Sequence, residues 1–148
     1  MKAMRTLAVT TLFALLLPFL AACGGGEPAT MASIPTFPTA TELQTGQNPM
    51  ADTLAETMKS AISGNLKSDV KLYELPADAT WDQVKSFYSE ALGSGDWKAA
   101  TELDTSNEAL STTGWKRGSL ASEQVLMVGF MPALLGGAPV MIVSLFSE

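Results

Sequence analysis

The sequence predicts a small single α+β domain over residues 50–148, with two helices packed on a mostly antiparallel sheet of about four to five strands. Two segments with helical spacing of apolar residues, 51–63 and 81–92, predict the helices. Runs rich in β-branched and aromatic residues predict the strands, and the last two, 125–130 and 140–146, flank a turn rich in glycine and proline. The domain therefore ends in a predicted C-terminal β-hairpin.

Each predicted helix has boundary signals of its own. The helix over 51–63 precedes Gly64-Asn65, which is a stop signal. The helix over 81–92 follows a capping box, in which Thr80 is the N-cap residue and Gln83 reaches back to it. The apolar stripes that these helices would bury are Met50, Leu54, Met58, Ala61 and Ile62 in the first, and Trp81 or Val84, Phe87, Tyr88, Ala91 and Leu92 in the second.

Further strands are predicted over 68–75, 97–103 and 113–118, with a polar loop over 104–111. The stretch from 124 to 147 contains no charged residue, so hydropathy alone would also allow a membrane span there. Glycine and proline residues near its middle favour a turn, and the hairpin is therefore the preferred interpretation.

Both faces of the first hairpin strand are apolar. Val125, Met127 and Met131 share one predicted face, and Leu126, Val128 and Phe130 share the other. Such a strand needs cover on both sides of the sheet. The two helices can divide between the faces, or both can pack on one face and leave the other to a partner or ligand. The sequence leaves both arrangements open.

The first 22 residues have the layout of a secretory signal peptide, because Lys2 and Arg5 precede an apolar run. The run ends in Leu20-Ala21-Ala22-Cys23, which resembles the lipobox of bacterial lipoproteins. The resemblance implies that Cys23, the single cysteine, receives a diacylglycerol, becomes the first mature residue and carries an acyl chain such as palmitate on its amino group. It also implies a place in the cell envelope, at the outer membrane or the outer face of the cytoplasmic membrane. A chance cysteine after an ordinary signal peptide or signal anchor is the alternative.

Residues 23–49 are predicted to be a disordered tether between this anchor and the domain. Glycines, prolines and threonines dominate the segment and leave little apolar surface to bury. Residues 34–38, Ile-Pro-Thr-Phe-Pro, would also suit a polyproline-type docking motif, but a plain linker is the simpler interpretation.

The composition excludes several kinds of chemistry. The chain has no histidine and a single cysteine, so imidazole-assisted nucleophilic catalysis, disulfides and Cys/His zinc sites are all ruled out. A formal net charge of −6 makes the chain a poor nucleic-acid binder, because phosphate neutralisation needs clustered lysine and arginine. No cofactor and no metal are predicted.

Carboxylates and methionines offer the remaining candidate chemistry. Asp78 and Asp82 flank a predicted helix start, and Glu102 and Asp104 flank a predicted strand end. Paired carboxylates can hydrolyse glycosides across a cleft, whereas helix-dipole stabilisation and solvation explain these residues without catalysis. A cluster of Met127, Met131 and Met141 would suit Cu(I), although methionine more often fills gaps in a core.

Two groups of residues are candidates for contact with a partner. Trp115, Lys116 and Arg117 form a basic-aromatic run that would suit an anionic headgroup or glycan, although a solvated strand end has the same pattern. Pro132, Leu134 and Leu135 lie at the uncharged tip of the hairpin. An apolar tip is unusual on a soluble monomer and marks a predicted contact with a partner or a membrane.

Phe87-Tyr88, Leu92, Gly95-Asp96-Trp97 and the run Trp115 to Gly118 resemble small uncharacterised domains of bacterial secreted lipoproteins, over residues 70–146. Those domains more often have Gly-Trp without the intervening aspartate, and the resemblance implies no catalytic residues. The prediction for function is a non-enzymatic, lipid-anchored envelope protein that binds another envelope protein or a small apolar ligand. The alternatives are a small carboxylate-dependent envelope hydrolase and a structural spacer.

Overall fold

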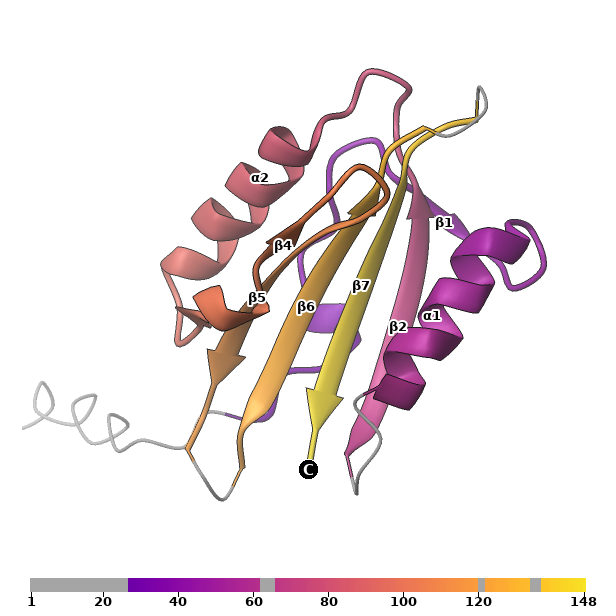
Figure 1. Cartoon of the computed structure of the whole chain (residues 1–148). Coiled ribbons are helices and arrows are strands. Elements are labelled where there is room, and N and C mark those ends of the chain that lie inside the picture. The colour runs from indigo at the N-terminus through magenta and orange to yellow at the C-terminus, as the bar shows by residue number, and fades with distance from the viewer. Residues whose placement is uncertain (1–26, 62–65, 120–121, 134–136) are drawn as a thin grey trace, which may run out of the picture.

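The computed structural model describes residues 27–61, 66–119, 122–133 and 137–148. These residues form two α-helices and a seven-stranded antiparallel sheet (Figure 1), which confirms the predicted α+β class and the C-terminal hairpin. The elements are η1 (Met31–Ser33), β1 (Thr41–Leu43), α1 (Pro49–Ala61), β2 (Lys67–Glu74), α2 (Trp81–Gly93), β3 (Lys98–Ala99), η2 (Thr101–Leu103), β4 (Thr105–Ser106), β5 (Ser111–Arg117), β6 (Gln124–Met131) and β7 (Val140–Ser147). The sheet is larger than predicted because two short strands outside the predicted ones, β1 and β4, extend its edges, while β3 is what remains of the predicted strand over 97–103.

The C-terminal hairpin occupies the centre of the sheet. The strand order is β1-β2-β7-β6-β5-β3, and β4 also pairs with β5. All pairs are antiparallel, and β6 pairs with β7 along its whole length, from Gln124 opposite Ser147 to Met131 opposite Val140. A central position explains why this charge-free stretch is apolar on both faces, since neither face meets water.

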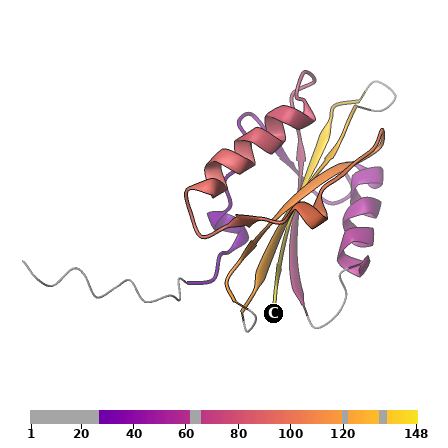
Figure 2. The same cartoon turned by 60° about the vertical axis from the view of Figure 1, so that its left-hand side comes forward.

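The two helices lie on opposite faces of the sheet (Figure 2), which settles the question that the sequence left open. On one face, Val84, Tyr88 and Leu92 of α2 pack with residues such as Leu126 and Val143. On the other face, α1 packs with Leu72, Met131, Val140 and Ile142 of the sheet. Alternate residues of β6 and β7 therefore belong to separate cores, as the predicted alternation requires.

The N-terminus of α2 carries the predicted capping box. The backbone N–H of Thr80 donates to Gln83 Oε1 at 2.8 Å, and the backbone N–H of Gln83 donates to Thr80 Oγ1 at 3.4 Å. The buried residues of α2 recur every four positions and form one stripe. The pattern of the sequence therefore fixes both the start of this helix and the face that it buries.

Helix α1 buries a stripe that matches the predicted one only in part. Met58 is buried and Leu54 packs against the same core, as predicted. The other buried residues are Ala51 and Ala55, whereas Met50 is 56% exposed. The small alanines allow the helix to lie close to the sheet, which turns the larger Met50 outward. Residues 62–65, where the predicted helix end lies, are outside the described residues.

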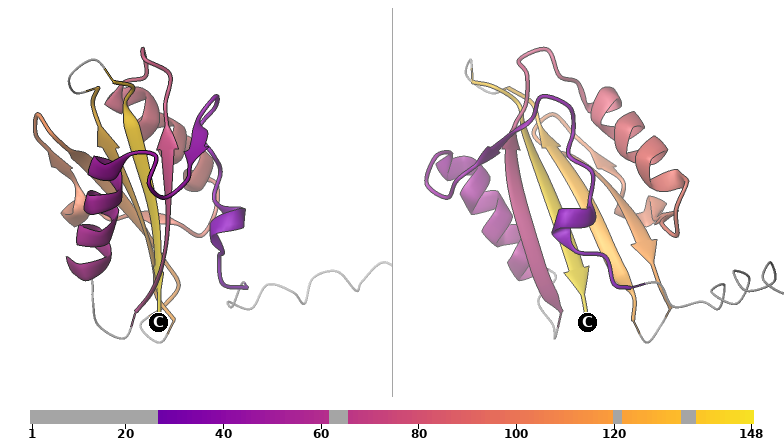
Figure 3. Two further views of the ribbon diagram at one scale, coloured as in Figure 1. Left: turned by 90° about the vertical axis from the view of Figure 1, so that its right-hand side faces the viewer. Right: turned by 180° about the vertical axis from the view of Figure 1, so that it is seen from behind.

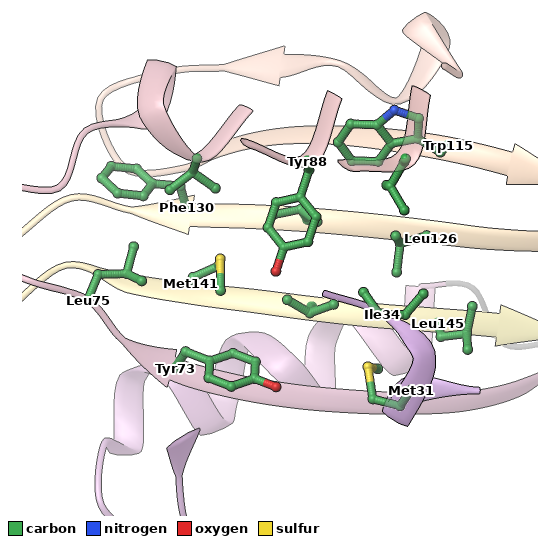
Figure 4. Packing of buried hydrophobic residues seen from close by; sticks show 14 residues of the cluster. Met31, Ile34, Tyr73, Leu75, Tyr88, Trp115, Leu126, Phe130, Met141 and Leu145 are labelled. Atoms are coloured by element: carbon green, nitrogen blue, oxygen red, sulfur yellow. The ribbon is translucent and has the colours of Figure 1, made fainter. Parts of the chain in front are cut away.

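The prediction of a disordered tether through residue 49 is wrong for the described part of that segment. Met31 and Ile34 are buried in the core beside α2, and Phe37 and Ala40 pack against it (Figures 3 and 4). Strand β1 follows and pairs with β2 at the sheet edge. The reason is a spacing of three between these apolar residues together with two tight turns. The 3₁₀ turn η1 joins Met31 to Ile34, and a second turn, in which the Ala40 N–H donates to the Phe37 carbonyl at 3.1 Å, joins Phe37 to Ala40.

The chain between α2 and β5 also differs from the prediction. The expected strand over 97–103 is only two residues of β3 followed by the 3₁₀ turn η2, and β4 lies within the predicted polar loop. The hydroxyl of Thr112 donates to the backbone carbonyl of Leu103 at 2.8 Å, and the Leu103 side chain covers Gly114. This segment therefore wraps the outer edge of β5.

The closeness of η2 to β5 depends on the missing side chain at Gly114. A Cβ atom there would meet the Leu103 side chain and lie 3.2 Å from the Leu126 carbonyl oxygen. We predict that Gly114→Ala lowers the free energy of unfolding by about 1–3 kcal/mol, measured by urea denaturation of a soluble Cys23→Ser form. The matched control is Gly93→Ala, where a Cβ has open space and the change should stay within about 0.5 kcal/mol.

The double variant Leu103→Ala with Gly114→Ala should lose less free energy of unfolding than the two single variants lose together, because Leu103→Ala removes the atoms that the new methyl group meets. Strictly additive costs would contradict the contact.

Candidate functional site

The predicted basic-aromatic run on β5 does not form one surface. Because neighbouring strand residues point to opposite faces, Trp115 is buried at 3% exposure beside Tyr88, with ring centroids 6.1 Å apart. Lys116 lies on the other face and pairs with Glu102 at 2.6 Å. Trp115 is therefore a core residue, and the prediction that its ring belongs to an exposed contact patch is corrected.

Arg117 has a role that the sequence does not suggest. Its Nη2 donates to the backbone carbonyl of Glu27 at 3.2 Å and lies 3.5 Å from Asp96 Oδ2. The guanidinium thus joins the end of β5 to the first described residue of the N-terminal segment.

The neighbouring residue Gln124 holds the same segment. Its side-chain amide accepts a hydrogen bond from the Ala29 N–H at 2.7 Å and donates one to the Ala29 carbonyl at 2.9 Å, and both bonds are buried. The amide thereby pairs with Ala29 as a neighbouring strand would. We call this pair of hydrogen bonds the Gln124 clasp. Its only signal in the sequence is a polar amide at the start of an otherwise apolar strand.

A shallow depression of about 270 Å³ lies between β3 and the end of β5. Ionic side chains of both signs line it, including Asp96, Lys98, Glu102, Lys116 and Arg117. The hydrogen bond from Lys116 lowers the pKa of Glu102, and Glu102 in turn raises the pKa of Lys116. Both groups therefore keep their charge near neutral pH and are unsuited to exchange protons with a substrate.

The carboxylates weighed as catalytic candidates are held in structural contacts or stand at a helix start. The side chain of Asp104 receives hydrogen bonds from Lys85 at 2.9 Å and from the Thr113 hydroxyl at 2.7 Å. These two bonds, with Lys85 the larger influence, lower the pKa of Asp104. Asp82 lies in the first turn of α2, where a negative charge stabilises the helix dipole. The lowered pKa values of Asp104 and Glu102 favour their ionised forms, whereas the general acid of a hydrolase needs a raised pKa.

The three methionines do not gather into one site. Met141 belongs to the core under α2, whereas Met127 and Met131 belong to the core under α1. The sheet itself therefore separates their thioethers. Within the described ranges, no group of three or more acidic, histidine or cysteine side chains is arranged to hold a metal ion.

The chain leaves β6 for the hairpin tip at the end of the sheet opposite the Gln124 clasp. Strand β6 ends at Met131, and the half-buried Pro132 follows it. Leu134, Leu135 and Cys23 lie outside the described residues. The backbone N–H of Leu75 donates to the Pro139 carbonyl at 2.9 Å and fixes the return of the chain into β7.

Two hydroxyl groups are buried away from the surface contacts. The side-chain oxygens of Tyr88 and Ser144 lack a hydrogen-bond partner of standard geometry among the described residues, although the Tyr88 hydroxyl lies near the Phe37 backbone. Burial raises the pKa of Tyr88, so its phenol stays neutral. Both side chains are fully buried and serve as packing groups in their cores.

The aromatic residues that resemble those of small domains in bacterial secreted lipoproteins lie close together in the structure. Phe87 and Tyr88 meet edge to face at 5.1 Å, Tyr88 contacts Trp115, and Trp97 packs at the border of the same core. Packing between α2 and β5 accounts for the spacing of these residues without a further function.

No family model, curated protein or solved structure matches this chain. In the part of the chain that the structure describes, no helix is long and apolar enough to cross a membrane.

The ion pair between Lys85 and Asp104 joins α2 to the chain between η2 and β4. This contact can be tested by mutation. We predict that Lys85→Met raises the pKa of Asp104 toward 3.8, its ordinary value, when the carboxyl resonance is titrated by NMR. The matched variant Lys59→Met, which breaks an exposed pair with Glu56 on α1, should leave the pKa of Asp104 unchanged.

Because the folded-state pKa of Asp104 is lowered, the stabilisation it gives is present above pH 3.8 and is lost as the pH falls through the lower folded-state value. The stability difference between the wild type and Asp104→Asn should therefore narrow below about pH 4. If Lys85→Met leaves the pKa of Asp104 unchanged, the ion pair between Lys85 and Asp104 is contradicted.

Proposed function

We propose that this chain is a lipid-anchored protein of the bacterial cell envelope, and that its folded part is a non-enzymatic binding module. The observation that carries the proposal is the sequence Leu20-Ala21-Ala22-Cys23 behind a basic and apolar leader, with the single cysteine of the chain at its end. Acyl chains on one cysteine would hold the protein stably at a membrane, at about 0.8 kcal/mol per buried CH₂ group.

The geometry of the domain supports binding over catalysis. Glu102 and Asp104 are held by lysines that keep them ionised, and the depression beside Glu102 is shallow and lined by paired charges. Small-molecule enzymes normally use deeper, mostly apolar pockets with few convergent polar groups. The uncharged hairpin tip around Pro132, Leu134 and Leu135 remains the proposed contact for another envelope protein or a small apolar ligand.

The anchor is tested by Cys23→Ser. We expect this variant to carry no lipid, because no thiol remains for lipid attachment. It should leave the membrane fraction where another peptidase removes the leader, and any uncleaved precursor should stay at the membrane only through its apolar leader. The measurement is membrane fractionation with and without globomycin, an inhibitor of the lipoprotein signal peptidase. Gly26→Ala is the control and should fractionate as the wild type does. Unchanged fractionation of Cys23→Ser, together with insensitivity to globomycin, would refute the anchor.

The contact is tested by Leu134→Asp combined with Leu135→Asp. A photo-crosslinking residue is placed at the exposed position 133. In the double variant we expect crosslinks formed in intact envelopes to fall at least about tenfold, because two leucines buried in the proposed contact would contribute about 3 kcal/mol or more to binding. The matched control is Met50→Asp, which changes an exposed apolar residue elsewhere and should keep the crosslinks.

Circular dichroism separates the two explanations of a lost crosslink. An unchanged spectrum supports a contact at the tip, whereas a loss of structure shows that Leu134 and Leu135 are core residues. Crosslinks that persist in the double variant would contradict the proposed contact.

A further inference from the structure

One end of the sheet binds the part of the N-terminal segment that is closest in sequence to Cys23, and the other end does not. We call the end where β5 finishes and β6 begins the proximal end, because the Gln124 clasp and Arg117 bind the N-terminal segment there. Strand β2 begins and β7 finishes at this same end. The distal end carries the turn after β2, the β4–β5 turn and the hairpin tip, and the strands separate the two ends (Figure 1).

The chain between the anchor and the fold is short. Glu27, the first described residue, is the fourth residue after Cys23, so the two Cα atoms are at most about 14 Å apart at ~3.6 Å per residue. Strand β6 alone, with eight residues, is about 27 Å long at ~3.4 Å per residue. The reach of the tether is therefore shorter than the sheet is tall.

Residues 27–34 could lengthen the tether only by detaching from the domain, and detachment would lower its stability. Detaching residues 27–34 would break the buried Gln124 clasp and expose Met31 and Ile34, which belong to the core. The tether is thus limited to the residues before Glu27.

We infer that the proximal end of the sheet is a membrane-facing surface, held against the lipid that carries Cys23, and that the distal end points away from that lipid. The inference rests on the proposed lipidation of Cys23. The hairpin tip then meets partners in the space beyond the membrane and cannot insert into the bilayer to which the protein is anchored.

The side chains of the proximal end fit a lipid surface of no particular charge. Lys116 and Arg117 are paired with Glu102 and Asp96. The other described charges at this end are of both signs, because Lys67 and Lys98 are accompanied by Glu27, Glu123 and Glu148, so they do not add up to a positive patch that would select an acidic headgroup. Leu66, which directly precedes β2 at this end, is 37% exposed and is one of the large hydrophobic side chains left open to solvent. The tether and this apolar side chain, rather than charge attraction, set the orientation.

The test uses single-cysteine labelling of the lipidated protein, because acylated Cys23 leaves no free thiol. Ser122→Cys places a fluorophore at the proximal end and Glu108→Cys places one in the β4–β5 turn at the distal end, both at exposed positions. The protein, purified from membranes, is reconstituted into phosphatidylcholine vesicles that carry nitroxide on their headgroups. We expect the label at position 122 to be quenched at least threefold more than the label at position 108.

An insertion shows whether the short tether is the cause. Twenty Gly-Ser residues placed between Gly26 and Glu27 add a flexible reach of about 25 Å, and should reduce the difference between the two labels by more than half. The same insertion between Ala77 and Asp78, in the exposed turn after β2 and away from both labels, is the matched control and should keep the difference.

The outcomes separate this inference from the proposed function. Protein that fails to float with the vesicles would refute the lipid anchor, and the orientation with it. Protein that floats but shows equal quenching at both positions, or stronger quenching at position 108, would overturn the orientation and leave the anchor standing. A difference that survives the insertion at Gly26 would support the orientation but overturn the short tether as its cause.

Discussion

The need to cover both faces of one apolar hairpin governs this structure. Strands β6 and β7 carry no charged residue, and they lie at the centre of the sheet with buried side chains on both sides. Burial of this surface is the main favourable contribution to folding. Helix α1 shields one face and α2 part of the other, so the helices must divide between the faces. If both packed on one side, a continuous apolar surface would remain exposed on the other.

Helix α2 is too small to cover its face alone. It lies over the side of the sheet near β5, where Tyr88 contacts Trp115. Toward β7 and β2, the residues Tyr73 and Leu145 belong to the same core, and Met31 and Ile34 of the N-terminal segment complete the cover there (Figure 4). The N-terminal segment is therefore a third covering element, and the domain begins about twenty residues earlier than its regular helix and strand patterns indicate.

Periodicity in the sequence predicts the elements that repeat with a regular period. The capping box of α2, the hairpin and the alternation along β6 were accessible because periods of two and of nearly four are typical of strands and helices. The N-terminal segment follows a period of three over only ten residues, among prolines and threonines whose composition suggests disorder. The short strands β3 and β4 depend on the close approach of Leu103 to Gly114, a tertiary contact without a local signal.

The contacts of the candidate site, like the short strands, could not be predicted from periodicity in the sequence. Trp115, Lys116 and Arg117 are adjacent in sequence, yet a strand sends them in alternate directions, and each then finds a different partner. The residues that matter for the position of the domain, Gln124 and Arg117, act through the backbone of the N-terminal segment. Backbone atoms look alike at every position, so no pattern of side chains in the sequence could have paired Gln124 with Ala29.

The cover that Met31 and Ile34 provide also links the core to the anchor that we propose at Cys23. Because these side chains are buried, the fold holds the chain at Ala29 firmly, and it does so at the end of the sheet nearest Cys23 in the sequence. A segment that only connected the domain to a lipid would gain nothing from a buried amide pair, since water would satisfy its backbone equally well. The Gln124 clasp replaces that water with two buried hydrogen bonds, and in doing so it places the start of the tether at one fixed point on the domain. The same residues that complete the hydrophobic core would thereby determine which end of the sheet the proposed anchor can reach.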